Sequence, residues 1–419
     1  MNNILIKSNP ILGTFYYDNT KAPAMLYKTK LRIAMDLQTT GDEIIRSLNN
    51  KCNTIPNGIF TYTEGVVSLL GCKLTEKRFN TNGAALRTIA INYAIYGRQD
   101  SNDAFYRVRA FIPKICGITQ PVINISYTKA NDEYTVIAKY NSNKVQLSDT
   151  ICVSYNYKIQ FSPKSIKQIG SDYQAKTYDI TSDKLNLYYV TCIESRSTVP
   201  INIKKHIDNI ESIIKLLSII YWDNIQYNKL ECTDECGENP YWSRIETSIP
   251  PYDKSPHNTT LHISSSITPE IFSNWLNLLS RHKNRELIYK ITNFISCSNA
   301  RTRDALMNIC IGFEGLWYLE IKNSDTKCRH ERILNRIKDI CNYIGMPDSQ
   351  STAIAENISC SYNGIKHADN EHSDVGMYTI FNVLRQSSII FRLFICKLIG
   401  MKIDYGEVAK LLSGRSEED

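Results

Sequence analysis

The side chains best suited to chemistry lie in one short stretch, residues 361–370. Asn363 and His367 are four positions apart, so they share one face if the stretch is helical, and Lys366 lies beside them. A histidine titrates near neutral pH and can move protons, while amide and ammonium groups can donate hydrogen bonds to a phosphate. In RNA the ribose 2′-hydroxyl attacks the neighbouring phosphorus, so the substrate supplies its own nucleophile. The stretch therefore suggests RNA cleavage without a metal.

The same residues also fit the end of a helix that has no chemical role. Gly364 loosens the last turn, and Lys366 and His367 place positive charge near the negative end of the helix dipole. Spacing alone leaves both interpretations open.

A second group of residues has the spacing of a zinc site. Cys232 and Cys236 are separated by three residues, and His257 and His262 follow in the same loop-rich segment. The chain has 13 cysteines and 7 histidines, so such a grouping arises readily by chance. We therefore expect no bound metal and no cofactor.

Basic residues on two predicted helix faces also have two interpretations. These residues are Arg301, Arg303, Arg329, Arg332, Arg336 and Lys338. As phosphate contacts they would position RNA, and as ordinary surface they would pair with Asp304, Glu331 and Asp339. Glu314 could orient His367, or it could be a solvated or capping glutamate.

The composition is that of an ordinary globular chain. Its 419 residues suffice for two or three domains, and its net charge of +7 is compatible with RNA binding without requiring it. The 13 cysteines follow no disulfide pattern, which favours reduced thiols and a cytoplasmic location. The most apolar stretch, around residues 389–399, contains Arg392 and Lys397, so we expect it not to cross a membrane.

Short runs of β-branched and aromatic residues dominate the chain from residue 11 to about residue 200. They are punctuated by Gly, Asn, Asp and Pro, which favours an antiparallel sandwich or barrel. Examples are residues 13–17, 31–35, 58–62, 66–70, 134–138 and 187–190.

The periodicity changes near residue 202, where apolar residues predict a helix over residues 207–220. A strand and loop segment follows, and Thr268 with Pro269 then marks another helix start. Further helices are predicted over residues 287–294, 301–322, 329–343, 352–367 and 375–401. The predicted class is α+β, with three regions. These are a β-rich, sandwich-like region at 1–200, a mixed helix and strand continuation at 201–284, and an all-α helical bundle at 285–419.

The stretch around His367 resembles the signature of the HEPN superfamily, in which Arg-Asn, three residues and His lie at a helix end. Asn363 and His367 match this signature, and Tyr362 stands where the arginine is usual. Residues 313–314 resemble an apolar–Glu pair of the first long HEPN helix, and residues 398–400 resemble the end of the last one.

The N-terminal part is similar to the β-rich domain of the ApeA-like branch of HEPN proteins. Residues 13–17, 65–72, 94–97 and 105–109 look like its successive strands. The resemblance covers most of the chain, more loosely in the middle.

The resemblance implies an antiviral protein of the abortive-infection type in bacteria. It implies cleavage of tRNA or other cellular RNA without a metal, in a homodimer whose two motif-bearing helices meet in one site. We expect the N-terminal region to sense a phage-derived trigger protein. The alternative is a noncatalytic RNA-binding or dimerisation module, because tyrosine at position 362 cannot replace the planar fork of arginine.

In the catalytic interpretation His367 transfers the proton, and Asn363 orients it or contacts the scissile phosphate. Lys366 stabilises the charge that develops on the phosphate oxygens, with Tyr362 and Glu314 in supporting positions. His367→Ala should therefore abolish cleavage and toxicity while the fold stays intact. Tyr362→Arg should raise cleavage or leave it similar.

Overall fold

The structure is a computed structural model of the chain. It describes residues 10–17, 20–29, 32–39, 54–55, 57–79, 85–98, 100–113, 123–130, 133–140, 145–161, 168–169, 175–179, 185–222, 224–237, 240–247, 267–296, 302–328, 330–366, 377–402 and 412.

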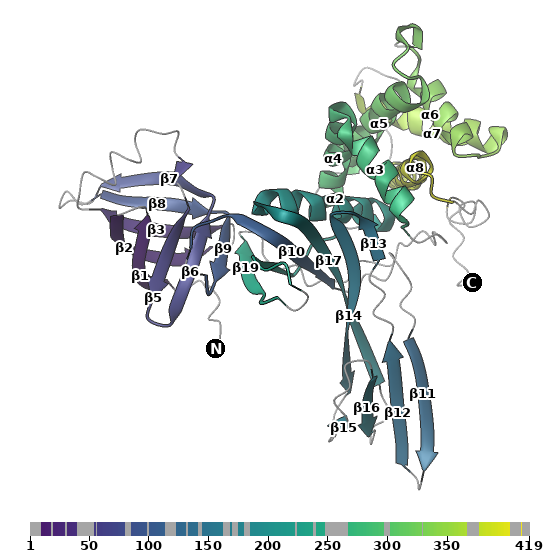
Figure 1. Cartoon of the computed structure of the whole chain (residues 1–419). Coiled ribbons are helices and arrows are strands. Elements are labelled where there is room, and N and C mark those ends of the chain that lie inside the picture. Colours follow the sequence, from purple (N-terminus) through teal and green to yellow (C-terminus); the bar gives the residue numbers. More distant parts are fainter. Residues whose placement is uncertain are drawn as a thin grey trace.

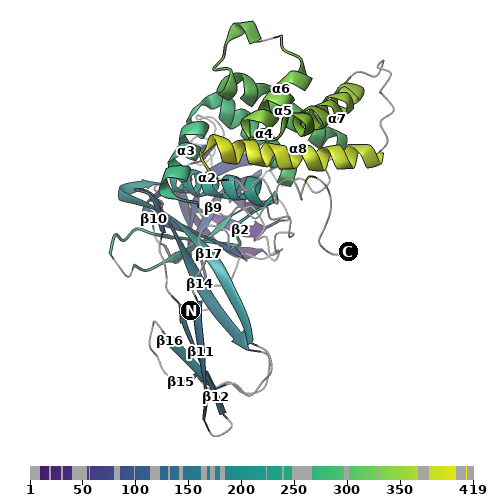
Figure 2. The same ribbon diagram turned by 90° about the vertical axis from the view of Figure 1, so that its right-hand side faces the viewer.

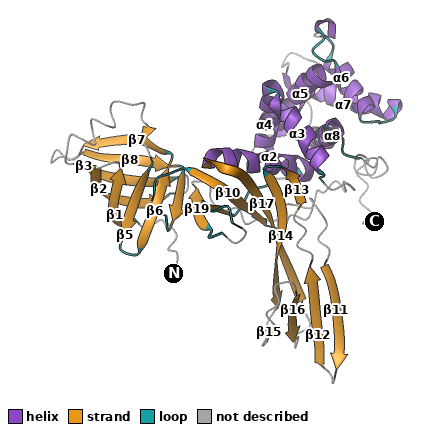
Figure 3. Ribbon diagram, viewed as in Figure 1, coloured by secondary structure: helices purple, strands orange, loops and turns teal. Residues whose placement is uncertain are grey.

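The described residues form an α+β protein, as predicted, with strands up to residue 247 and helices from residue 269 to residue 398 (Figure 3). Helix α2, Ile203–Tyr221, is placed between strands of the β-rich part. The predicted strands are confirmed over the described residues, with residue 31 outside them, and residues 58–62 match β5 residue for residue.

Fifteen strands form one continuous sheet, in the order β13-β14-β17-β10-β18-β19-β9-β6-β5-β1-β2-β3-β8-β7-β4. Their bounds are β1 Ile11–Tyr17, β2 Thr20–Lys28, β3 Ile33–Thr39, β4 Thr54–Ile55, β5 Gly58–Tyr62, β6 Gly65–Leu70, β7 Cys72–Phe79, β8 Ala85–Ile91, β9 Tyr93–Tyr96, β10 Ala104–Pro113, β13 Val145–Ser148, β14 Ile151–Phe161, β17 Leu185–Asn202, β18 Lys229–Thr233 and β19 Ser243–Thr247. Its pairs are all antiparallel.

The N-terminal strands of this sheet curl around a core of their own. In Figure 1, β7 and β8 run across the direction of β5 and β6, so the sheet faces itself. The enclosed apolar side chains come from every strand between β1 and β9 except β4, and Phe60, Leu26 and Met35 are among those fully buried. This curled part supplies the two facing apolar layers that the sandwich-like prediction required.

The middle of the sheet carries helix α2 on one face. Helix α2 contacts β10 and β17 as well as α4 and α8, and it lies between the sheet and the other helices (Figure 1). Its isoleucines and leucines are buried. Strands β14 and β17 continue away from the helices as a two-stranded ribbon (Figure 2). Beside the far end of the ribbon lies a second sheet, of order β11-β12-β16-β15, with β11 Ile123–Ala130, β12 Glu133–Tyr140, β15 Gln168–Ile169 and β16 Ala175–Asp179.

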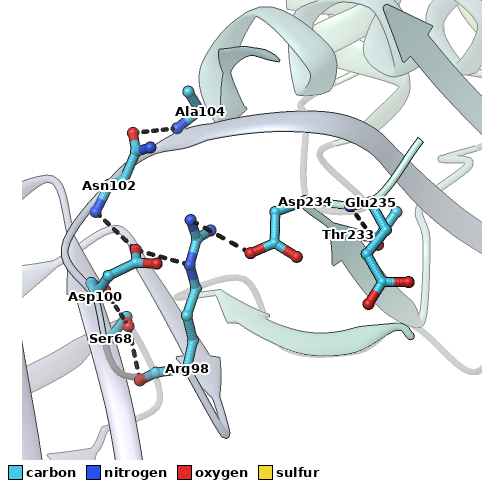
Figure 4. A network of polar contacts seen from close by, with 8 residues as sticks. All are labelled: Ser68, Arg98, Asp100, Asn102, Ala104, Thr233, Asp234 and Glu235. Carbon is cyan, nitrogen blue, oxygen red and sulfur yellow. Dashed lines mark hydrogen bonds and ion pairs between the residues drawn. The ribbon is translucent and has the colours of Figure 1, made fainter. Parts of the chain in front are cut away.

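A polar network ties the curled part to the middle of the sheet (Figure 4). Arg98 is 8% exposed, and its Nε lies 2.8 Å from Asp100 Oδ1 at an angle outside hydrogen-bond geometry. Its Nη2 lies 3.9 Å from Asp234 Oδ2, beyond β18. Ser68 of β6 donates to the Arg98 carbonyl at 3.0 Å, and Asp100 accepts from the Asn102 amide. The connection between the two parts is therefore fixed by side chains from three segments.

The C-terminal part of the described chain is helical. Its elements are α3 Pro269–Ser280, α4 His282–Ser296, α5 Thr302–Leu316, a π-helical segment Trp317–Ile321, a 3₁₀ turn Thr326–Cys328, α6 Ile333–Tyr343, α7 Asp348–Lys366 and α8 Met377–Leu398. The helix start predicted at Thr268 is confirmed, because its side chain accepts a hydrogen bond from Ile271 N and Pro269 follows.

Helix α8 lies within the protein core. Residues Thr379–Leu398 are long and apolar enough to cross a membrane by length and composition alone, despite the charges of Arg392 and Lys397. However, 67% of that window is buried against the rest of the described chain, and core helices pass the same test. The apolar surface of α8 is thus already covered by protein.

One continuous core joins the middle of the sheet to all the helices. It includes Val108 of β10, Leu217 of α2, Trp275 of α3 and Phe394 of α8. The expected boundary between residues 284 and 285 lies within α4, and the three-domain division stays a prediction.

Candidate functional site

The last turn of α7 carries three of the predicted site residues. Tyr362, Asn363 and Lys366 are described, whereas His367 lies outside the described residues. Asn363 is partly buried and Lys366 is exposed. Lys366 occupies the final residue of α7, where a cation is favoured by the helix dipole. Two of the predicted donors therefore reach solvent at one helix end.

Tyr362 packs into the core on the inner side of this turn. It is 3% exposed and belongs to the large apolar cluster. Lys366 Nζ lies 3.4 Å from the Tyr362 hydroxyl and 5.1 Å from the centre of its ring. Burial raises the pKa of Tyr362, and the Glu314 carboxylate raises it further, while Lys366 opposes both effects. Tyr362 is therefore a neutral packing residue that orients Lys366.

Glu314 of α5 lies near this turn and is paired with an arginine. Its Oε1 is 3.8 Å from Arg336 Nη1 of α6, and both side chains are largely buried. Glu314 also raises the pKa of Cys310, after burial, so that thiol stays protonated. Glu314 thus joins α5 to α6 and acts electrostatically on Tyr362 of α7, and it is neither a helix cap nor freely solvated.

Trp317 extends this polar group toward the end of α5. Its buried ring is approached by Arg336 at 5.1 Å and Lys322 at 5.4 Å, and its Nε1 donates to Asp339 Oδ2 at 3.1 Å. Lys322 also forms an ion pair of 2.9 Å with Asp339. Helical spacing could not reveal these two cations around Trp317, because Lys322 follows the π-helical segment and Arg336 comes from α6.

The basic residues divide between paired and exposed positions. Arg336 pairs with Glu314 and Lys338 with Asp348, at 3.8 and 3.2 Å. Arg303 and Arg332 are exposed, and Arg301 and Arg329 lie outside the described residues. The ion pairs predicted for Arg336 and Lys338 thus form with other partners than Glu331 or Asp339.

The zinc hypothesis falls partly outside the described residues, because His257 and His262 are not among them. Cys232 is buried in β18 and Cys236 is exposed beyond it. Burial raises the pKa of the Cys232 thiol, which disfavours the thiolate that a metal needs. The described residues contain no group of three or more His, Cys, Asp or Glu side chains arranged to hold a metal ion.

The end of α7 can therefore bind an anion through Asn363 and Lys366. Behind it, the group formed by Glu314, Arg336 and Trp317 joins α5 and the π-helical segment to α6.

Comparison with known families identifies the β-rich part. The ApeA N-terminal domain 1 matches residues 10–276, which is more than half of the 419-residue chain. The chain belongs to the ApeA family. Membership indicates an ApeA-type antiphage defence protein. No curated protein and no solved structure matches the chain.

The ApeA match ends within α3, so the candidate site at the end of α7 lies outside it. The matched strands and α2 nevertheless share one core with the helices that carry the site. The ApeA region and the candidate site are therefore parts of one packed body.

Proposed function

We propose that this ApeA-family protein is a metal-independent endoribonuclease of HEPN type whose active site forms at the end of α7. The observation that carries the proposal is the placement of Asn363 and Lys366 on the solvent side of the last turn of α7, next to His367 in the chain. These groups match the needs of phosphate binding and proton transfer.

The reaction follows from RNA chemistry and these side chains. The 2′-hydroxyl attacks phosphorus, the bond from phosphorus to the 5′-oxygen breaks, and a 2′,3′-cyclic phosphate and a 5′-hydroxyl result. His367 moves the proton between these oxygens. Asn363 orients His367 or contacts the scissile phosphate, and Lys366 stabilises the charge on its oxygens. Tyr362 holds Lys366 in place, and Glu314 pairs with Arg336 beside this turn.

The active form in this proposal is a cytoplasmic homodimer joined through the helical part, with two α7 ends in one site. Its substrate is RNA, either tRNA or another cellular RNA. The β-rich region recognises a phage-derived trigger protein and transmits that event through the shared core to the helices.

The test uses purified full-length protein, total cellular RNA, a chelator and the trigger supplied by phage-infected cell extract. We expect His367→Ala to lower the cleavage rate by about 10²–10⁴ and Lys366→Ala by about 10²–10³. Lys397→Ala, at an exposed lysine in the last turn of α8, is the matched control and should cleave like wild type. Mass measurement by light scattering reports the dimer.

A noncatalytic RNA-binding or dimerisation module is the second candidate, and the burial of Tyr362 favours it. The residue in the usual arginine position is 3% exposed, so it cannot contact a phosphate. Tyr362→Arg would place a guanidinium in the core, which makes it a test of folding rather than of chemistry. Equal cleavage by wild type and His367→Ala, or none by wild type with trigger present, would establish this second candidate.

A further inference from the structure

A cavity of about 440 Å³ lies beside the start of α4, and none of the candidate site residues line it. One wall comes from the junction of α3 and α4, with Arg281, Lys283 and Asn284. The other comes from the π-helical segment and the turn after it, with Leu319 and Ser324. Its volume falls in the range of small-molecule sites, roughly 300–1,000 Å³.

The start of α4 is electropositive, and no side chain of the described residues caps it. A single residue, Arg281, separates α3 from α4. The first amides of a helix have no partner within it, and no described side chain accepts from those of residues 282–284. The first turn of α4 has no acidic residue and instead carries His282 and Lys283, which the helix dipole disfavours. A bound anion would accept hydrogen bonds from these amides and offset the positive charge at the start of α4.

Asn284 adds a requirement for a hydrogen-bond donor. It is fully buried, and its Nδ2 donates to Leu278 O at 3.3 Å and to Glu320 Oε1 at 2.6 Å. Both partners are acceptors, so the amide orientation is fixed. Its Oδ1 has no hydrogen-bond partner among the described residues, and Asn284 lines the cavity. A buried acceptor in this position is left without a donor, which a water or the N–H or O–H group of a bound molecule would supply.

The carboxylate of Glu320 does not fill the anion position. Its Oε1 accepts from Arg281 Nη1 at 2.6 Å as well as from Asn284, so it links the two walls. Lys283 remains exposed at the cavity.

We propose that this cavity binds a nucleoside phosphate, either a free nucleotide or the 5′-phosphorylated end of an RNA. The phosphate lies at the first amides of α4 with Lys283, and a ribose hydroxyl or base N–H donates to Asn284 Oδ1. The site uses none of the groups proposed for RNA cleavage and does not depend on that activity.

The experiment measures equilibrium binding to the full-length His367→Ala protein, so that cleavage cannot consume RNA. The probes are ADP, GDP, CDP, UDP, inorganic phosphate, and an RNA tetranucleotide with a 5′-phosphate or a 5′-hydroxyl. Lys283→Glu is compared with Lys290→Glu, which has the same charge change at an exposed position of α4 outside the cavity.

We expect at least one nucleoside diphosphate or the 5′-phosphorylated RNA to bind at least about tenfold tighter than inorganic phosphate. Lys283→Glu should weaken that binding by about tenfold or more, and Lys290→Glu should leave it within about twofold. Preference for the phosphorylated RNA over mononucleotides assigns the RNA end, and the reverse assigns a free nucleotide.

Three results would overturn the proposal. One is the absence of saturable binding by every nucleotide and RNA probe. Another is equal binding by the two charge-reversed variants. The third is inorganic phosphate that binds as tightly as the nucleotides, because Asn284 would then have no role.

Discussion

Arg392 shows how a single charged residue can hold two helices together in an apolar region. It lies in α8, is 4% exposed, and donates to the carbonyls of Ile219 and Ile220 at the end of α2. Burial lowers the pKa of Arg392 to about 10, which leaves it charged at neutral pH. A cation is favoured at the negative end of a helix, and here it comes from a distant segment.

We predict that Arg392→Met lowers the free energy of unfolding by about 1–3 kcal/mol, because carbonyl oxygens of α2 lose a buried donor. Urea unfolding followed by circular dichroism measures the change. Lys397→Met, at an exposed lysine of the same helix, should change it by less than about 0.5 kcal/mol. Equal effects of the two substitutions would remove the proposed role of Arg392.

His206 fixes α2 to the sheet. It is fully buried, with Nδ1 2.9 Å from Ser195 Oγ of β17 and Nε2 2.9 Å from the Phe105 carbonyl of β10. The carbonyl can only accept, so neutral His206 donates from Nε2 and accepts at Nδ1 from Ser195. Burial lowers the pKa of His206 below 6.5, with a smaller contribution from Lys205.

This lowered pKa predicts a loss of stability in acid. Below pH 6.5 the unfolded chain binds a proton at His206 that the folded chain resists, so the free energy of unfolding falls as the pH falls toward the folded pKa. The slope from this group is at most about 1.4 kcal/mol per pH unit. Burial raises the pKa of Glu211, which opposes this trend at lower pH.

Unfolding curves of wild type and His206→Gln isolate the contribution of His206 to the free energy of unfolding. They are measured between pH 5 and 7.5, roughly the window around the unperturbed histidine pKa. The difference between the two proteins should shrink as the pH is lowered. A constant difference across that window would show that His206 binds protons equally in both states.

At the residue level, the sequence indicated which side chains lie beside one another at the end of α7, but not which of them are buried. Asn363 and Lys366 follow from helical spacing, which is a local property. The burial of Tyr362 and the pairing of Glu314 with Arg336 depend on α5 and α6, which spacing within α7 cannot specify.

At the level of elements, two glycines allow α4 and α5 to approach closely. A Cβ on Gly312 would lie 2.2 Å from Ile291 Cδ1, and one on Gly315 would lie 2.4 Å from Leu287 Cδ1. Ile291 is 1% exposed, so it has little room to move away. This close contact positions α4 against the helix that carries Glu314.

We predict that Gly312→Val destabilises the protein by about 1–3 kcal/mol, because the added methyl groups overpack the contact between α4 and α5. Chemical denaturation reports the loss. Gly237→Val is the control, since no atom lies within 4 Å of a Cβ there, and it should remain close to wild type. An unchanged denaturation midpoint for Gly312→Val would mean that α4 and α5 can move apart with little loss of free energy of unfolding.

Helix starts were predictable where they depend on nearby residues, and helix irregularities were not. Thr268 caps α3 through its own side chain, so its sequence signature was sufficient. The predicted helix over residues 301–322 instead changes to a π-helix at Trp317. There Trp317 donates to Asp339 and Arg336 approaches its ring, both from α6. Those contacts are nonlocal, and periodicity does not report them.

At the level of the whole molecule, the two apolar cores divide the chain unevenly. The core of the curled part uses residues between Phe15 and Tyr96 only. The larger core runs from Leu70 to Leu412, and Trp275 of α3 donates to the Ser212 carbonyl of α2 within it. The helices after residue 285 therefore share their core with α2, α3 and the sheet.

We predict that residues 1–98 expressed alone unfold cooperatively, whereas residues 285–419 expressed alone do not. The second fragment loses the apolar faces of α2 and α3, on which its helices pack. Thermal unfolding by near-ultraviolet circular dichroism distinguishes the two, with the full-length chain as reference. A sharp transition for residues 285–419 would instead establish an independent helical domain.

The order of the fifteen strands could not be predicted from the sequence. Strand β9 pairs with β19, and β10 lies between β17 and β18, so neighbours in the sheet are far apart in the chain. Alternating residues indicate that a segment is a strand, but they carry little information about its partner. The α+β class was therefore predictable, and the single continuous sheet was not.

The long ribbon of β14 and β17 is, in mechanical terms, a lever. Its register runs without a shift from the pair Ile151–Ser195 to the pair Phe161–Leu185, over the 11 residues of β14. Strand β17 also pairs with β10 up to the pair Pro113–Val190, so the free arm runs from Tyr157–Tyr189 to Phe161–Leu185. At about 3.3 Å per residue these five residues span about 16 Å. On the sheet side of the arm, Ser195 of β17 is bonded to His206 of α2. A load applied at the far end therefore acts as a torque at α2, and the helices that share its core bear the reaction.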